Sequence, residues 1–140
     1  MSEDVTERGL KVFAEIMGVD RAAEMRAGLA NDSFGAAIGK LATDFAFGSV
    51  WSREGLERKQ RSLVVIGVLI AQRQTLELKN HVRIGIRNGL TVRELEEALI
   101  QTIPYVGFPA AASATTAVVE VLREQGLDVS TLTSEERGML

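Results

Sequence analysis

The stretch LELKNHVRIGIRNGLTVRELEEAL, residues 76–99, decides the fold. Its first half repeats apolar residues every three or four positions, which is the pattern of an amphipathic α-helix. Thr75 is placed to cap this helix, and Gly89 to end it as a left-handed C-cap. Thr91 and Glu94 then form a capping box, in which each side chain bonds the other residue's backbone N–H. The stretch therefore predicts two consecutive helices with a tight turn between them.

The rest of the chain has the same helical pattern, with Gly, Asn, Ser and Thr at the segment ends. We predict an all-α fold, a single-domain bundle of about six helices over residues 1–140. Helical periodicity runs over about 4–17, 20–30, 34–47, 57–74, 76–88, 91–102 and 109–125. The segment LVVIGVLIA, residues 63–71, is apolar on all sides, so we expect its helix to be buried on every side.

Three smaller features complete the fold prediction. Pro104 is expected to end one helix and Pro109 to start the next. The last residues, 127–140, are expected to form a short helix or a partly ordered tail, with a cap made by Thr133 and Glu136. The helix over 34–47 is expected to face the core with the residues that recur at helical spacing, Phe34, Ala37, Ile38, Leu41 and Phe45.

Composition excludes several classes of function. The net charge of -3 and pI ≈ 5.3 argue against a nucleic-acid partner. The absence of cysteine excludes disulfides, thiolate nucleophiles and cysteine-ligated zinc, and a single histidine makes a transition-metal site unexpected. No apolar run approaches the ~20 residues that span a bilayer, so no membrane partner is expected. The acidic start MSEDVTERG lacks the features of a secretory signal, which favours a soluble, cytoplasmic protein.

The only histidine, His81, follows Glu77 by one helical turn. This spacing lets the carboxylate favour the charged imidazolium, which suits a group that delivers a proton near neutral pH. Glu77, His81, Ile84 and Asn88 share one shoulder of the helix, which can line a pocket. An ordinary surface pair, or a half-buried structural histidine, fits the spacing equally. The opposite face is expected to point to water and carries Lys79, Arg83 and Arg87.

Several motifs taken together are more specific than this pair. They are FGSVWSREGL at 47–56, RSLVVIGVLIA at 61–71, ELKNH at 77–81, RNGLT at 87–91 and YVGFPAA at 105–111. Over about residues 8–124 they resemble the carboxymuconolactone decarboxylase family, especially its γ-carboxymuconolactone decarboxylase branch. The resemblance implies an alkylhydroperoxidase D-like fold and a homotrimer or homohexamer. The first helix and the helix over 109–125 are expected to offer apolar surface for such assembly. The peroxidase activity of CxxC-containing members is excluded, because the chain has no cysteine.

The reaction implied by the resemblance is decarboxylation of an unsaturated lactone carboxylate, γ-carboxymuconolactone or a close relative, in the β-ketoadipate pathway of aromatic compound catabolism. Loss of CO2 leaves an electron pair conjugated with the lactone carbonyl, so the ring itself is the electron sink and no cofactor is needed. The protein must hold the substrate carboxylates, stabilise the developing oxyanion and reprotonate a ring carbon.

These tasks are assigned to named residues. His81 delivers the proton and Glu77 orients it. Arg61 binds a substrate carboxylate, because its guanidinium can bind bidentately and stays charged, and Arg73 is the second candidate. A structural ion pair is the alternative role for Arg61, and core filling is the alternative for the tryptophan. The expected pocket walls are Trp51 and Tyr105.

Two other functions stay open at this point. The chain departs from the decarboxylase branch at Phe45 and Phe47, where the branch carries His and Trp, and at Arg73 and Gln74, where it carries Asn and Arg. A less polar lactone is therefore an alternative substrate. An isomerase or dehydratase acting on a lactone or cyclic enone would need the same groups. A catalytically silent small-molecule-binding member is the remaining alternative, against which the joint presence of Arg61, Glu77 and His81 argues.

Overall fold

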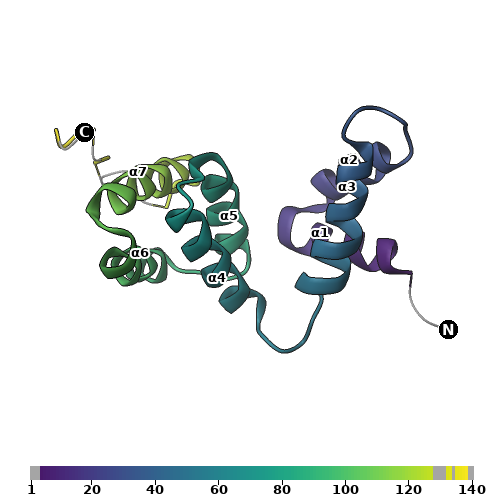
Figure 1. Cartoon of the computed structure of the whole chain (residues 1–140), viewed down its shortest axis with the longest axis horizontal. Coiled ribbons are helices and arrows are strands. Elements are labelled where there is room, and N and C mark those ends of the chain that lie inside the picture. Colours follow the sequence, from purple (N-terminus) through teal and green to yellow (C-terminus); the bar gives the residue numbers. More distant parts are fainter. Residues whose placement is uncertain (1–3, 128–131, 134, 139–140) are drawn as a thin grey trace. The chain divides into compact units, whose positions relative to one another are not determined.

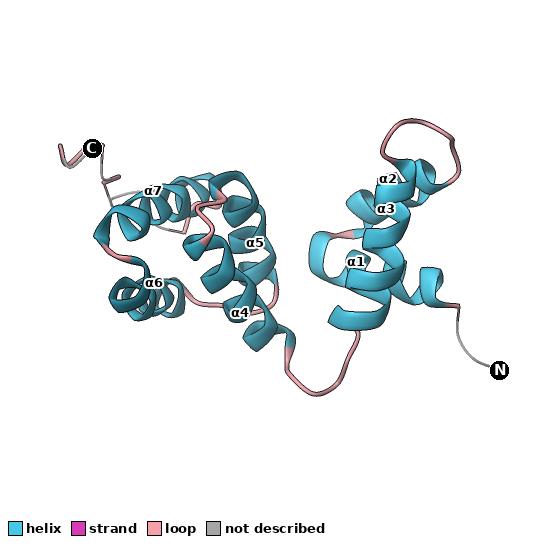
Figure 2. Ribbon diagram, in the orientation of Figure 1, coloured by secondary structure: helices cyan, strands magenta, loops and turns pink. Residues whose placement is uncertain are grey.

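The computed structural model describes residues 4–127, 132–133 and 135–138. This part of the chain forms seven α-helices and one π-helical segment, η1, and contains no strand (Figures 1 and 2). The all-α prediction is confirmed. The contacts divide the chain into two compact units, Met1–Glu57 and Arg58–Leu140. The single-domain interpretation therefore stays a prediction.

The first unit contains α1 (Val5–Met17), α2 (Val19–Leu29), α3 (Ala36–Leu41) and η1 (Ala42–Trp51). The Asp4 side chain caps α1 by accepting a 2.7 Å hydrogen bond from the Thr6 N–H. Gly18 ends α1 with a φ of 97° and leads directly into α2. The first two helices therefore lie where the sequence predicts them.

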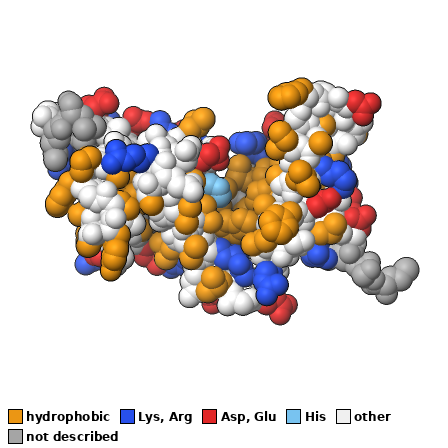
Figure 3. Space-filling view, viewed as in Figure 1, with side chains coloured by type: hydrophobic (Ala, Val, Ile, Leu, Met, Phe, Trp, Pro, Cys, Tyr) orange, Lys and Arg blue, Asp and Glu red, His pale blue; other side chains and the backbone are white. Residues whose placement is uncertain are grey.

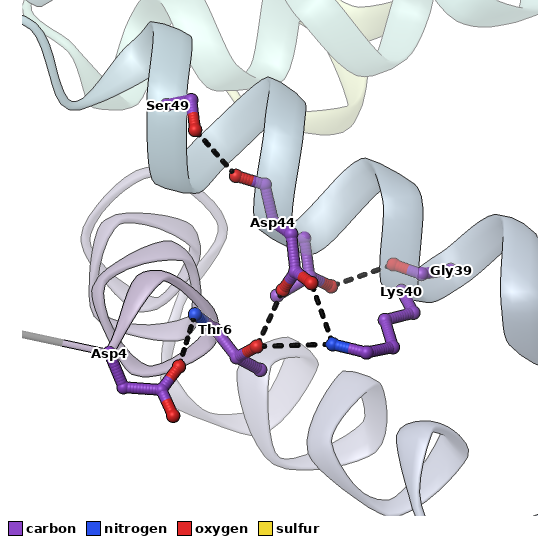
Figure 4. A network of polar contacts seen from close by, with 7 residues as sticks. Asp4, Thr6, Gly39, Lys40, Asp44 and Ser49 are labelled. Carbon is purple, nitrogen blue, oxygen red and sulfur yellow. Dashed lines mark hydrogen bonds and ion pairs between the residues drawn. The ribbon is translucent and has the colours of Figure 1, made fainter.

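The helix α1 packs against η1 at very short range. A Cβ atom added to Gly9 would lie 2.1 Å from the carbonyl oxygen of Thr43, and one added to Gly48 would lie 2.5 Å from that of Val5. Only glycine permits backbones to approach so closely. Beside this contact Asp44 accepts 2.6 Å hydrogen bonds from the Thr6 hydroxyl and the Lys40 ammonium (Figure 4). Steric fit and a charged network thus fix one relative position of the two elements.

The prediction for residues 34–47 is wrong in two respects. The helix begins at Ala36 and changes to π geometry at Ala42, so the expected loop from residue 48 is helical as far as Trp51. The predicted core face is also exposed, and Phe34 is fully accessible. Phe34 lies before the first residue of α3, and in η1 the i→i+5 hydrogen bonding of the π-helix brings Thr43 and Gly48 to the buried side. The exposed residues are Phe34, Ala37, Ile38, Leu41 and Phe45.

The second unit contains α4 (Arg58–Ala71), α5 (Thr75–Arg87), α6 (Val92–Val106) and α7 (Phe108–Glu124). Helices α4 and α7 each pack against both α5 and α6, which gives a four-helix arrangement. Its core includes Ile66, Ile70, Leu78, Val82, Leu95 and Val121.

Helix α4 is not buried on every side, contrary to the prediction. Ser62, Ile66 and Ile70 face the core, whereas Val64 is 59% and Val68 48% exposed. The other helices of this unit cover one side of α4 only. An apolar segment therefore remains at the surface of the described chain.

The ends of the remaining helices agree with the sequence in most places. The capping box is confirmed, with hydrogen bonds of 3.0 and 3.1 Å between Thr91 and Glu94. Thr75 is the first residue of α5 and makes no side-chain cap, contrary to the prediction. Pro104 does not end α6, which continues to Val106, contrary to the prediction. Proline cannot donate the helical hydrogen bond to the carbonyl of Ile100, and Ile100 is itself an exposed residue. Pro109 lies in the first turn of α7, as predicted.

The C-terminal segment has one predicted feature among its described residues. The Glu136 N–H donates a 3.1 Å hydrogen bond to the Thr133 hydroxyl, which confirms the expected cap. Arg123 of α7 binds the Glu136 carboxylate through two nitrogens, at 2.7 and 3.0 Å, and thereby ties this turn to the helix. The rest of the predicted tail, at 128–131, 134 and 139–140, lies outside the described residues.

Candidate active site

His81 lies in the middle of α5, next to the fully buried Val82. Its side chain is half-buried and its Nδ1 atom is shielded from solvent. Burial lowers the pKa of His81 below its ordinary value of about 6.5, and the nearby Glu77 carboxylate raises it by a smaller amount. The carboxylate therefore acts in the predicted direction, and burial outweighs it, so that the net shift of the His81 pKa is downward. The resting imidazole is mostly neutral at neutral pH.

The shoulder of α5 that carries His81 changes from exposed to buried along its length. Glu77 is exposed at one end, Ile84 is 4% exposed, and Asn88 is half-buried at the other end. The Asn88 side-chain amide donates a 2.9 Å hydrogen bond to the hydroxyl of Ser62 on α4. The shoulder therefore follows the line along which α4 and α5 meet.

The opposite face of α5 packs along α7 rather than pointing to water. Lys79 forms an ion pair with Glu120, and Arg83 binds Glu124 at 2.7 Å. The prediction of a solvated face is thus wrong for these two residues, because α7 lies within reach of both side chains. Arg87 is exposed, as predicted. Lys79 and Arg83 therefore face α7, and the shoulder that carries His81 lies on another side of α5.

The register between α4 and α5 determines which residues of α4 lie opposite His81. Ser62 faces Asn88, and Ile66 faces Gly85, because a Cβ on Gly85 would lie 3.4 Å from the Ile66 side chain. The helices are antiparallel, so His81 lies level with about residue 69 of α4. Arg61 is then two turns away, about 12 Å along the helix axis.

Arg73 lies in the connection between α4 and α5, about one helical turn from the level of His81 and on the side opposite to Arg61. The structure therefore places His81 between the two arginines along the length of the helices. Arg61 is half-buried, with its Nε atom shielded from solvent, whereas Arg73 is exposed and has a φ of 56°.

The two aromatic residues expected as pocket walls lie elsewhere. Trp51 is 8% exposed and lies at the end of η1 in the first unit. Tyr105 is 83% exposed on α6, which packs on α4 and α7. The second unit alone does not bring either ring to His81, and their role as walls stays a prediction.

Metal ligands do not gather in the part of the chain that the structure describes. No three histidine or acidic side chains there lie close enough together to hold a metal ion. None of the helices in the same residues is both long and apolar enough to cross a bilayer. His81, Glu77, Arg61 and Arg73 are the charged or titratable groups considered for the chemistry of the site.

Known proteins resemble this chain over the same elements. Residues 36–120, which run from α3 through most of α7, match the carboxymuconolactone decarboxylase family. The chain belongs to the carboxymuconolactone decarboxylase family. It is 38% identical to the 4-carboxymuconolactone decarboxylase of Acinetobacter baylyi over 124 residues, which cover 86% of this chain and 89% of that protein. This carboxymuconolactone decarboxylase is therefore similar to the chain over nearly its whole length.

A second relative matches a shorter region. The nitrosuccinic acid decarboxylase of Metarhizium robertsii is 45% identical over 75 residues, which cover 54% of this chain. The chain spans about half the length of that relative, 52%. Both relatives are decarboxylases by name.

The sequence prediction missed the partners that surround the site. Ser62 lies in the motif RSLV, and Asn88 lies in RNGLT, but nothing in either motif pairs them, since they are far apart in the chain. Thr75 and Ser113 line a pocket with Arg73 and were not singled out for it. The Ser62–Asn88 hydrogen bond and the pocket beside Arg73 both depend on packing between helices, which a single sequence does not show.

Proposed function

We propose that the chain is a cofactor-free decarboxylase of an unsaturated lactone carboxylate, γ-carboxymuconolactone or a close relative, acting in aromatic-acid catabolism in the cytoplasm. The proposal rests on the half-buried His81, with Glu77 one helical turn away. Arg61 and Arg73 lie on opposite sides of His81 along the length of the helices. The decarboxylase names of the relatives support the same reaction type.

The reaction begins with cleavage of the bond between the ring carbon and the carboxylate. CO2 leaves, and the electron pair moves into the ring and onto the lactone carbonyl oxygen, which gives a dienolate. The charged form of His81 then donates a proton to the ring carbon next to that carbonyl, and the neutral imidazole regains a proton from solvent. Arg61 holds a substrate carboxylate, and Arg73 is the second candidate for this role.

The lowered pKa of His81 is compatible with this role. A bound substrate brings negative carboxylates close to the imidazole, and a nearby opposite charge favours the imidazolium. Binding therefore supplies the proton when it is needed. Burial makes that imidazolium a stronger acid than an exposed one, which favours transfer to carbon.

The decisive experiment is a product analysis in D2O with γ-carboxymuconolactone. A decarboxylase releases one CO2 per substrate and leaves one deuterium on the ring carbon that His81 protonates. An isomerase gives a product with the mass of the substrate apart from exchanged deuterium, and a silent binding protein gives no product. Either of these results would reject decarboxylation.

Nitrosuccinic acid is the second substrate to test. The relative that is 45% identical over 75 residues is named for it. Its nitro group can accept the electron pair left by CO2, so the same arrangement of a proton donor and carboxylate-binding arginines would serve. A kcat/KM for nitrosuccinate above that for the lactone would move the assignment to this substrate.

We further propose that the chain assembles as a trimer or hexamer. Large apolar side chains lie at the surface of each unit (Figure 3). They include residues of α3, η1, α4 and α6 and Phe108 at the start of α7, whereas the large apolar residues of α1 are mostly buried. Exposed apolar surface of this kind is typical of subunit contacts. Light scattering should give three or six times 15.2 kDa, and an active monomer at micromolar concentration would contradict the proposal.

A further inference from the structure

Three helices of the second unit end in the same hydrogen-bonded turn. In each, a backbone N–H bonds the carbonyl five residues earlier: Gln74 to Leu69 after α4 at 3.0 Å, Leu90 to Gly85 after α5 at 2.8 Å, and Leu127 to Leu122 after α7 at 2.9 Å. This turn requires a left-handed residue, for which glycine is strongly preferred.

The left-handed residue is glycine in two of the three turns. Gly89 has a φ of 102° and Gly126 a φ of 68°. After α4 the same position is taken by Arg73, with a φ of 56°, the one non-glycine residue with positive φ in the described part of the chain. A side chain is strained there, and such strain persists where the side chain itself is needed.

The Arg73 side chain borders a pocket of about 200 Å³ between the end of α4, the start of α5 and the first half of α7. Arg73 takes part in no ion pair within the part of the chain that the structure describes. Thr75 and Ser113 add two hydroxyl groups to the pocket wall, and the remaining lining is apolar. We call this the Arg73 pocket; its apolar lining is Leu69, Ile70, Leu78, Ala110 and Ala114.

We propose that the Arg73 pocket binds one carboxylate of the substrate, and that this is why an arginine is kept at a position suited to glycine. The guanidinium can bind a carboxylate bidentately, and the hydroxyls of Thr75 and Ser113 can donate to the same oxygens. The apolar lining accommodates the carbon arm that bears the carboxylate. This inference rests on the proposed function, and it makes Arg73 a carboxylate ligand in addition to Arg61.

The first test is Arg73→Gly. Glycine relieves the strained backbone, so the Tm should rise by about 4 °C, while KM for the lactone substrate should rise at least tenfold. Ser113→Ala keeps the backbone unchanged and should raise KM about fivefold with little change in Tm. Arg73→Gly with an unchanged KM would overturn the proposal, and so would a lowered Tm, which would show that the side chain is structural.

The matched control is Gly126→Arg, which places an arginine at the equivalent position after α7. An added Cβ meets nothing within 4 Å there, so the variant introduces the strain without a clash. Its Tm should fall by about as much as that of Arg73→Gly rises, and its KM should not change. A Tm that does not fall would show that arginine is not strained at this position, and would remove the basis of the inference.

Binding of succinate tests the pocket without turnover. Millimolar succinate should raise the Tm of the wild type and have no effect on Arg73→Gly. Equal stabilisation of both proteins would overturn the proposal, and equal stabilisation of the wild type by inorganic phosphate at matched ionic strength would show a general anion site instead. A protein that turns over no lactone but binds succinate through Arg73 would reject the proposed function and retain the pocket.

Discussion

The side-chain amide of Asn88 donates a 2.9 Å hydrogen bond to the hydroxyl of Ser62 and so joins the end of α5 to the second turn of α4. Ser62 is completely buried, and Asn88 is half-buried. Arg61 precedes Ser62 in the chain, and Asn88 shares a helix shoulder with His81. This one bond therefore fixes the register between the helices that carry the predicted proton donor and its carboxylate-binding partner.

Replacing Asn88 by Ala should lower the free energy of unfolding by about 1 to 3 kcal/mol, because the buried Ser62 hydroxyl loses its partner. Ser62→Ala should have a similar effect. The double variant should lose less than the sum of the two, since both remove the same bond. Urea denaturation measures all three, and additive losses would show that the bond does not couple these residues.

His81→Ala should reduce kcat/KM for the true substrate by about 10²-fold to 10⁴-fold, the usual contribution of a general acid or base. Its helical content should not change, because the side chain is only half-buried. Arg87→Ala, on the exposed face of the same helix, is the control and should keep full activity. A His81→Ala variant with more than about a tenth of wild-type activity would remove His81 from the mechanism.

Arg61→Lys should weaken substrate binding or slow turnover, because lysine keeps the charge and loses the bidentate geometry. Steady-state kinetics and thermal melting are measured on the same preparation. Unchanged kinetics with a lowered Tm would show that Arg61 forms a structural ion pair.

The lowered pKa of His81 predicts a loss of stability in acid. The unfolded chain binds a proton at His81 near the ordinary pKa of about 6.5, and the folded chain binds it only at lower pH. Stability from this residue is therefore fully present above pH 6.5 and is lost as the pH falls. His81→Gln should become relatively more stable than the wild type between pH 7 and 5, measured by urea denaturation. A difference that does not change with pH would contradict the lowered pKa.

Gly9→Ala should destabilise the protein by at least about 2 kcal/mol, because the new Cβ would lie 2.1 Å from a backbone oxygen that cannot move aside easily. Gly28→Ala is the matched control in α2, where nothing lies within 4 Å of the added atom. The control should be neutral or stabilising by up to about 1 kcal/mol. Equal effects of the two substitutions would show that the α1–η1 contact tolerates extra volume.

Helix positions could be predicted from the sequence because their signals are local. Gly89 and the Thr91–Glu94 box act within a few residues, and the structure confirms both. Burial could not be predicted in the same way, since it depends on which elements pack together. The π geometry of η1 also had no signal in the sequence.

The candidate site likewise has features that the sequence predicts and features that only the packed structure shows. The sequence placed Glu77 and His81 on one helix face, and the interaction between them has the predicted sign. The net lowering of the His81 pKa could not be predicted from the spacing, because it is set mainly by desolvation in the folded chain. The Ser62–Asn88 bond joins two distant motifs, so only the packed structure shows it.

The placement of the aromatic residues gives each unit its own optical signal. The single tryptophan, Trp51, is buried in the first unit, and the single tyrosine, Tyr105, is exposed in the second. Tryptophan emission should shift to longer wavelength when the first unit unfolds, while circular dichroism follows the helices of both. Coincident fluorescence and dichroism curves would mean that the units unfold as one cooperative domain, and separate midpoints would mean that each is stable on its own.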